Sequence, residues 1–286
     1  MAKLNSTILR REIQHIKDLF VEAALAKQIL DVSFIGNASD IYEWEPTPIV
    51  DLDVCLFVSQ RDSGVGRWLS RLQRSLTERM NTAGIDFDLR LIRGPYKQVP
   101  LHIERPVIVV HMSLFTEEMY LDRPKLLRWA WRKYSGVMDS TRFLRMAPEK
   151  PTYQELLEGR SGVMQKLQSV ESGSAPFLEY KLPDFTELRW TVRLGEPLFA
   201  EYCLSAGATC ARNHGRVLGR DEPDCLGNRD FVAWYDNNLL SSAAFRALMD
   251  LKNKVRNEGY SEAIVAPTLA QSYLRELCEC IAKATP

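Results

Sequence analysis

The stretch IVDLDVCLFV, from Ile49 to Val58, decides how this sequence folds. It is rich in β-branched and aromatic residues and follows a loop that contains two prolines, so its composition predicts a β-strand. Side chains alternate between the two faces of a strand. Asp51 and Asp53 therefore project from one face, and the apolar side chains between them project from the other. The strand combines an apolar face for a core with a face that carries two carboxylates.

The elements around this strand follow from the spacing of apolar residues. Apolar residues three and four positions apart predict an amphipathic helix from about Asn5 to Leu30 and a second helix from Arg67 to Ala83. Apolar or alternating runs predict further strands at VSFIG (Val32 to Gly36), IDFDLRLI (Ile85 to Ile92) and PVIVVHMSLF (Pro106 to Phe115). This order of elements predicts a small mixed sheet covered by helices.

The second part of the chain begins after a change in composition. Residues 146–183 are rich in Pro, Gly, Ser and Glu, which predicts a linker region with one helix between flexible connections. Beyond it, Asp184 and Glu187 form a capping pair for a helix through Leu194. The sequence therefore predicts an α+β fold, with a mixed-sheet domain over residues 1–145 and a helical domain over 184–286. Further helices are predicted at Pro197 to Asn213, Phe231 to Lys254 and Thr268 to Ala284.

A second predicted strand also carries acidic residues on one face. Alternation along GIDFDLRLI projects Asp86, Asp88 and Arg90 from one face. If the two acidic strands are neighbours, a third carboxylate joins Asp51 and Asp53. Carboxylates held close together raise one another's pKa unless a cation lies between them, and such hard oxygen ligands suit magnesium. An isolated D-x-D pattern is usually a solvated strand face, but acids inside apolar strands are costly to bury unpaired, which favours a cation site.

The segment FIGNAS, from Phe34 to Ser39, completes a pattern with the two acidic strands. Together, from Val32 to Leu91, they resemble the polymerase-beta-type nucleotidyltransferase superfamily, in which a hydrophobic-Gly-Ser signature precedes the D-x-D motif and a third acid lies on a following strand. The resemblance implies that Gly36, Asn37 and Ser39 hold the phosphates of a nucleotide. Backbone N–H groups in a glycine turn before a helix suit such an anion.

The resemblance also implies a reaction. Asp51 and Asp53 would ligate two magnesium or manganese ions, and Asp88 would complete the site, with Asp86 in reserve. One ion activates an acceptor hydroxyl and the other neutralises a triphosphate, so that a nucleoside monophosphate is transferred and pyrophosphate leaves. Arg90 would meet the triphosphate. The chain is therefore expected to be a magnesium-dependent nucleotidyltransferase.

Charge and composition restrict the partners and the compartment. Among 286 residues, Lys plus Arg and Asp plus Glu each total 37, so no net positive field draws the chain to nucleic acid or to an anionic membrane. We expect a nucleoside triphosphate and a small-molecule or protein acceptor as partners, and neither nucleic acid nor membrane. The first residues scatter charges and no apolar stretch could span a bilayer, which predicts a cytoplasmic protein. Six cysteines without short repeated spacings fit reduced thiols.

Two alternative functions stay open at this level. Asn37 stands where the family usually has serine or glycine, so the chain could be a nucleotide-binding relative without catalysis. A D-x-D glycosyltransferase also holds a metal with two acids. Such enzymes, however, build a long nucleotide-binding sheet before the motif, whereas here only one helix and one strand are predicted before Asp51.

Two other sequence patterns are weaker indications of a functional site. Cys203, Cys210 and His214 fall on one helical face and Cys225 follows, which is a set of soft ligands for zinc. Without a C-x-x-C pair, buried thiols are the favoured interpretation. His111 borders a predicted strand, without sequence neighbours that suggest general-base chemistry.

Overall fold

The computed structural model describes residues 6–35, 47–92, 105–122, 153–217, 228–258 and 263–283. The chain divides into two compact units, and the division passes through a β-hairpin. Leu178–Arg189 belongs to the first unit, with the elements before residue 123, whereas Trp190 onward belongs to the second. Each unit has its own hydrophobic core.

The first unit contains the strands and helices that apolar spacing predicts and, in addition, one short helix that it does not predict, α3. Its elements are α1 (Ser6–Leu25), β1 (Asp31–Ile35), β2 (Ile49–Phe57), α2 (Ser63–Thr82), β3 (Asp86–Ile92), β4 (Val107–Phe115) and α3 (Glu117–Leu121). Helix α2 begins where the Asp62 side chain accepts a hydrogen bond from the Val65 N–H, a normal N-cap. It thus starts a few residues before the predicted Arg67.

Together with β5 (Ser174–Lys181) and β6 (Thr186–Arg193), the strands of the described residues form one six-stranded mixed sheet in the order β1-β2-β4-β3-β5-β6. Strand β1 is antiparallel to β2, while β4 lies between β2 and β3 and is parallel to both. Strand β5 (Ser174–Lys181) is antiparallel to β3, with Leu91 opposite Tyr180 and Ile92 opposite Glu179. The α+β class and the mixed sheet with flanking helices are confirmed.

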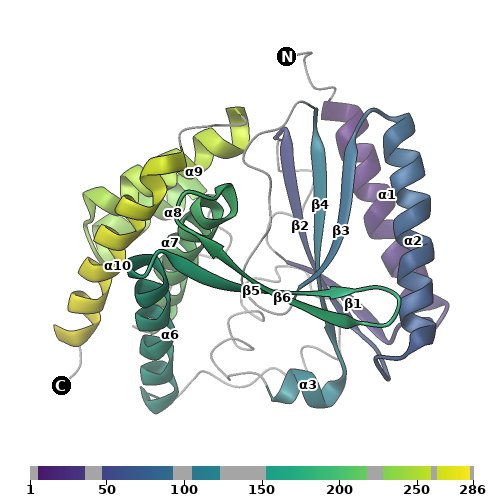
Figure 1. Cartoon of the computed structure of the whole chain (residues 1–286), viewed down its shortest axis with the longest axis horizontal. Coiled ribbons are helices and arrows are strands. Elements are labelled where there is room, and N and C mark those ends of the chain that lie inside the picture. The colour runs from purple at the N-terminus through teal and green to yellow at the C-terminus, as the bar shows by residue number, and fades with distance from the viewer. Residues whose placement is uncertain are drawn as a thin grey trace. The chain divides into compact units, whose positions relative to one another are not determined.

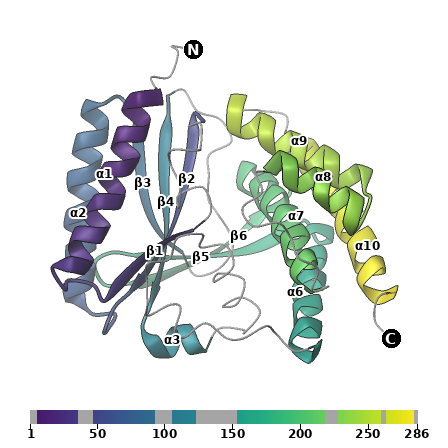
Figure 2. The same ribbon diagram turned by 180° about the vertical axis from the view of Figure 1, so that it is seen from behind.

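Helices α1 and α2 cover one face of β2, β4 and β3 (Figure 1). The same arrangement is seen from behind in Figure 2. The covered face of the sheet is apolar: the side chains of Leu52 and Val110 are fully buried against Ile13 and Leu76 of the helices. Burial of each such side chain contributes about 1.5–3 kcal/mol. Because alternation places every second residue there, the remaining side chains of these strands face away from α1 and α2.

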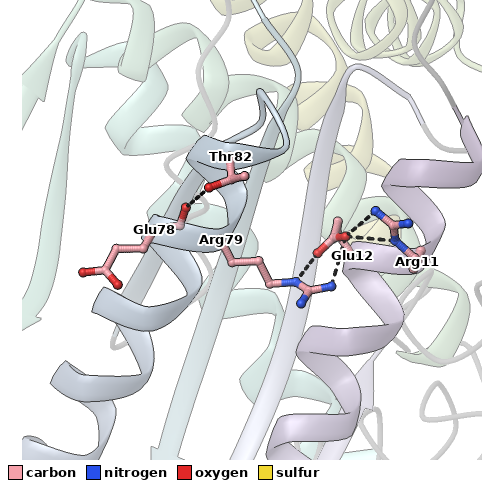
Figure 3. A network of polar contacts seen from close by, with 5 residues as sticks. All are labelled: Arg11, Glu12, Glu78, Arg79 and Thr82. Carbon is pink, nitrogen blue, oxygen red and sulfur yellow. Dashed lines mark hydrogen bonds and ion pairs between the residues drawn. The ribbon is translucent and has the colours of Figure 1, made fainter.

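An ion pair joins the two covering helices (Figure 3). Glu12 of α1 is buried, and its carboxylate accepts hydrogen bonds from Arg79 of α2 (Nη2 to Oε1, 3.2 Å) and from Arg11 (Nε to Oε1, 3.1 Å). Burial by itself raises the pKa of Glu12, but the two guanidinium groups outweigh burial and the pKa is lowered. The carboxylate is therefore held in its charged form.

The segment predicted as a helix from Asp184 through Leu194 is instead strand β6 (Thr186–Arg193), so that prediction is wrong. Its apolar side chains alternate with polar ones, which is the pattern of a strand. The turn before it packs on the start of α2: a Cβ built on Gly66 would lie 1.8 Å from the Pro183 carbonyl oxygen. Glycine is required there because the two backbone segments approach each other closely.

The second unit is mainly helical. The helix predicted from Phe231 to Lys254 is two helices, because Ser242 caps a new helix through a hydrogen bond from the Phe245 N–H to its Oγ (3.0 Å). No helix among the described residues has the length and apolar character needed to cross a bilayer. The helices of the second unit are α6 (Tyr153–Glu171), α7 (Pro197–Val217), α8 (Asn228–Asn238), α9 (Ala243–Glu258), the short 3₁₀ helix η2 (Ala263–Val265) and α10 (Ala266–Lys283).

A chain of polar groups crosses the core of this helical unit. His214 Nδ1 is hydrogen-bonded to the Tyr235 hydroxyl (2.7 Å), which is hydrogen-bonded to the Tyr273 hydroxyl (2.8 Å). The Cys280 sulfur lies 4.0 Å from His214 Nε2. Burial lowers the pKa of His214 to about 4 and raises the pKa of Tyr235. The imidazole and the Tyr235 hydroxyl are therefore neutral at physiological pH.

Candidate functional site

Strand pairing brings the predicted acids onto one face of the sheet. Asp51 of β2 and Asp88 of β3 both stand opposite Val109 of β4. One step further along, Asp53 and Arg90 both stand opposite His111. Aligned residues of parallel neighbours point to the same side, and this side is the one that α1 and α2 do not cover. We call Asp51, Asp53, Asp88, Arg90 and His111 the acidic face.

A small apolar cluster bounds the acidic face at one end. Further along β2 and on the same face, Cys55 and Phe57 pack with Phe115 and Tyr120, which lie at the end of β4 and in α3. The aromatic rings of Phe57 and Tyr120 meet edge to face, with centroids 5.3 Å apart. Along β2, the polar side chains of this face are thus confined to the first half of the strand, where Asp51 and Asp53 are half-buried.

Strand β4 separates the two acidic strands, so the condition for a third carboxylate on a neighbouring strand is not met. Two strand spacings place the backbones of Asp51 and Asp88 about 10 Å apart. The side chains of Asp51 and Asp53, in contrast, follow one another on a single strand. Asp51 and Asp53 therefore form a close pair, and Asp88 lies apart from them on the other side of Val109.

Arg90 contacts two carboxylates from two strands. Its Nε atom forms an ion pair with Asp88 Oδ2, and its Nη1 atom lies 3.6 Å from Glu179 Oε2 of β5. The exposed fractions of the three side chains are 29% for Arg90, 33% for Asp88 and 21% for Glu179. Because these side chains are partly buried, water screens the interactions between their charges less than it would on an open surface.

The reserve acid, Asp86, has a different cation partner. It forms an ion pair with Arg105, and both side chains are more exposed than those around Arg90, at 44% and 49%. The hydrogen bond with Asp86 also raises the pKa of Arg105. Asp86 is thus paired independently of Asp88.

Two residues of this face have no role in the sequence-based prediction. His111 is 3% exposed and lies within β4 between Asp53 and Arg90. The sequence does mark His111 as unusual. Alternation places it on the same strand face as Val109, and the earlier positions of that face are apolar. Glu179 lies on a strand that periodicity did not reveal. Burial raises its pKa, an effect that Arg90 partly offsets and Asp88 strengthens.

The donors of the acidic face suit a hard divalent cation. Asp51 and Asp53 offer carboxylate oxygens from one strand face, which is the chemistry that magnesium and manganese prefer. Asp88 offers the same chemistry across Val109 but is paired with Arg90. Within the described part of the chain, no three His, Cys, Asp or Glu side chains are grouped as a cation would need. The donor chemistry of Asp51, Asp53 and Asp88 thus suits a divalent cation, but the three carboxylates are not gathered into one cluster among the described residues.

Other predicted residues have no counterpart in this site. Gly36, Asn37 and Ser39, which the family resemblance assigns to phosphate binding, lie outside the described residues. Of the candidate zinc ligands, Cys225 also lies outside them. Burial raises the pKa of the Cys203 thiol to about 12, which is the behaviour of a core thiol.

Comparison with protein-family models, with curated proteins and with solved structures gives no significant match to this chain.

Proposed function

We propose that this chain is a nucleotidyltransferase that moves a nucleoside monophosphate from a nucleoside triphosphate to a hydroxyl-bearing acceptor. The observation that carries the proposal is the alignment of Asp51 and Asp88 opposite Val109, with Asp53 on the same face. Three carboxylates on one side of a mixed sheet, with a helix-covered apolar side behind them, give the acids a rigid support. The resemblance from Val32 to Leu91 points to the same reaction.

The chain's own residues divide the work by position. Asp51 and Asp53 would hold magnesium, which lowers the pKa of the acceptor hydroxyl and neutralises phosphate charge when bound. Asp88 faces the pair across Val109 and would complete the ligand set. Arg90, displaced from Asp88, would offer a planar set of donors to phosphate oxygens. Gly36, Asn37 and Ser39 would contact the phosphates, as the resemblance implies.

The balanced charge supports a small-molecule or protein acceptor, because a nucleic-acid substrate needs many phosphate contacts from a basic surface. The described cysteines Cys55, Cys203, Cys210, Cys278 and Cys280 are all free thiols, which supports a reducing, cytoplasmic location.

The test is a product search. The protein is incubated with each of the four nucleoside triphosphates, Mg²⁺ and a small-molecule extract, and products are identified by mass spectrometry alongside pyrophosphate release. Asp53→Asn should abolish both signals while circular dichroism stays unchanged. Glu22→Gln, which removes an exposed carboxylate of α1, is the control and should keep both. Equal turnover by Asp53→Asn and the unaltered chain would rule out the proposal.

One observation favours a second candidate, a nucleotide-binding protein without turnover. Arg90 occupies Asp88, the acid that the transfer reaction needs as its third ligand. Calorimetry with nucleoside triphosphates separates the two candidates: binding with no pyrophosphate release under any acceptor mixture supports the second.

A further inference from the structure

The starting point is the direction of the hydrogen bonds in the buried polar chain of the helical unit. The side chains of Tyr273, Tyr235 and His214, from α10, α8 and α7 (Figure 1), are each at most 1% exposed. Among the described residues, the Tyr273 hydroxyl has the Tyr235 hydroxyl as its hydrogen-bond partner and no other. If Tyr273 accepted that bond, its own buried O–H would have no acceptor, which is costly. Tyr273 therefore donates to Tyr235.

This direction fixes the position of the imidazole proton. Because Tyr235 accepts from Tyr273, its own O–H donates to His214 Nδ1 (2.7 Å). Burial lowers the pKa of His214 to about 4, so the ring is neutral at physiological pH and carries one N–H. Since Nδ1 is an acceptor, that N–H is at Nε2, which lies 4.0 Å from the Cys280 sulfur. The polar chain thus ends with a donor that faces a thiol sulfur.

Cys280 is partly exposed, whereas the other three members of the polar chain are buried. Cys278, on the same helix and also partly exposed, is its natural comparison. Helix α10 itself does not favour Cys280, because this residue lies in the last turn, where the helix end disfavours an anion. The thiolate is the form of a cysteine that attacks an oxidant, and an N–H donor stabilises that anion. The donor from His214 should therefore make Cys280 the more reactive of the two.

We propose that Cys280 is a modification site at which hydrogen peroxide oxidises the thiol to a sulfenic acid, and that His214 is the positioning residue that selects this cysteine. The sulfur attacks one peroxide oxygen, so that an S–O bond forms as the O–O bond breaks. Sulfur loses two electrons to the peroxide, and the thiol proton joins the departing hydroxide to give water. Partial burial of Cys280 favours so small an oxidant over a bulky disulfide. The proposal concerns the helical unit alone and does not rest on the proposed function.

The experiment treats the full, reduced chain with hydrogen peroxide and traps the sulfenic acid with dimedone. Cys278 and Cys280 lie in one tryptic peptide, residues 276–283, so fragment ions in mass spectrometry give the ratio of the two adducts directly. In the unaltered chain, Cys280 should be modified about fivefold to tenfold faster than Cys278. Cys280→Ser should remove the dominant adduct, and the matched control Cys278→Ser should leave it.

Three variants test the role of the imidazole. His214→Phe removes the donor, so the two cysteines should react within about twofold of each other. His214→Gln keeps a side-chain N–H and should restore part of the preference, a rescue that a purely structural role would not predict. Tyr235→Phe removes the hydroxyl that keeps the proton at Nε2 and should lower the ratio by about threefold. The buried thiols of Cys203 and Cys210 report on folding, because they should stay unmodified in a folded chain.

Several outcomes would overturn the proposal. Equal modification of Cys278 and Cys280 in the unaltered chain does so, as does the absence of an adduct on Cys280. A preference for Cys280 that survives His214→Phe in a folded chain also overturns it, because exposure alone would then explain the selectivity. If His214→Phe makes the buried thiols reactive, Tyr235→Phe decides: a lowered ratio supports the proposal, and an unchanged ratio overturns it.

Discussion

At the scale of single residues, the pKa of Glu179 depends on the positively charged neighbours Arg90 and Lys181 and on the negatively charged neighbour Asp88. Burial raises its pKa, Arg90 lowers it and Asp88 raises it. Arg90→Met should therefore move the pKa of Glu179 further upward, and Asp88→Asn should move it downward. Titration of ¹³C-labelled glutamate side chains by NMR measures both shifts. Shifts in the same direction in the two variants would show that Glu179 does not sense this pair.

A second residue-scale prediction concerns Gly66. A Cβ at this position would lie 1.8 Å from the Pro183 oxygen, a backbone atom that cannot move by rotating a side chain. Gly66→Ala should therefore destabilise the first unit by about 1–3 kcal/mol, despite the better helix propensity of alanine. Urea unfolding measures the loss.

The control for Gly66 is Gly162, in helix α6. A Cβ there would meet no atom within 4 Å, so Gly162→Ala should be neutral or stabilising by up to about 1 kcal/mol. If the two substitutions have equal effects, close packing at Pro183 is not what requires glycine.

At the scale of elements, α1 and α2 are joined by the ion pair of Glu12 and Arg79 (Figure 3). Arg79→Met should cost about 1–2 kcal/mol, because it leaves a buried carboxylate with Arg11 alone while water screens part of the lost interaction. A double-mutant cycle with Glu12→Gln, followed by urea unfolding at pH 7, measures the coupling.

The sign of the pH dependence follows from the lowered pKa of Glu12. Below its unfolded value of 4.5, the unfolded carboxylate becomes protonated before the folded one. The coupling energy is present above that value and should be lost as pH falls through the lower folded pKa. A coupling that grows on acidification would contradict the assignment.

The same scale shows what periodicity reveals and what it misses. Helix α1 and strand β2 each bury one regular face against a single partner layer, so local spacing predicts them. The sequence predicts a helix in place of β6 because Asp184 and Glu187 resemble a capping pair, although Leu188, Trp190 and Val192 alternate as a strand requires. The insertion of β4 between the acidic strands depends on long-range pairing, which spacing within one segment does not encode.

At the scale of the whole molecule, the sequence locates the acids but not their partners. The common direction of Asp51 and Asp53 follows from strand alternation alone. The contacts of Arg90 with Glu179, and the place of His111 between Asp53 and Arg90, arise from strands distant in sequence. The nucleotide-binding role remains a proposal that joins this geometry to a family resemblance.

The two units should also differ in their response to acid, because His214 lies in the core of the helical one. Its pKa of about 4 in the folded state is below the unfolded value of 6.5. The imidazole therefore contributes stability above pH 6.5, and this is lost as pH falls toward 4, at about 1.4 kcal/mol per pH unit and about 3 kcal/mol in total. Hydrogen exchange of α7 and α10 peptides, corrected for intrinsic rates, follows the loss.

Substitution of the histidine tests this origin directly. His214→Gln should flatten the pH dependence of α7 and α10 protection between pH 6.5 and 4, at the expense of stability at pH 7, because the hydrogen bond to Tyr235 is altered. His15→Gln, a substitution in the other unit, should leave that pH dependence intact. An unchanged slope in His214→Gln would mean that other groups make the helical unit acid-sensitive, and that the polar chain through Tyr235 and Tyr273 is indifferent to pH.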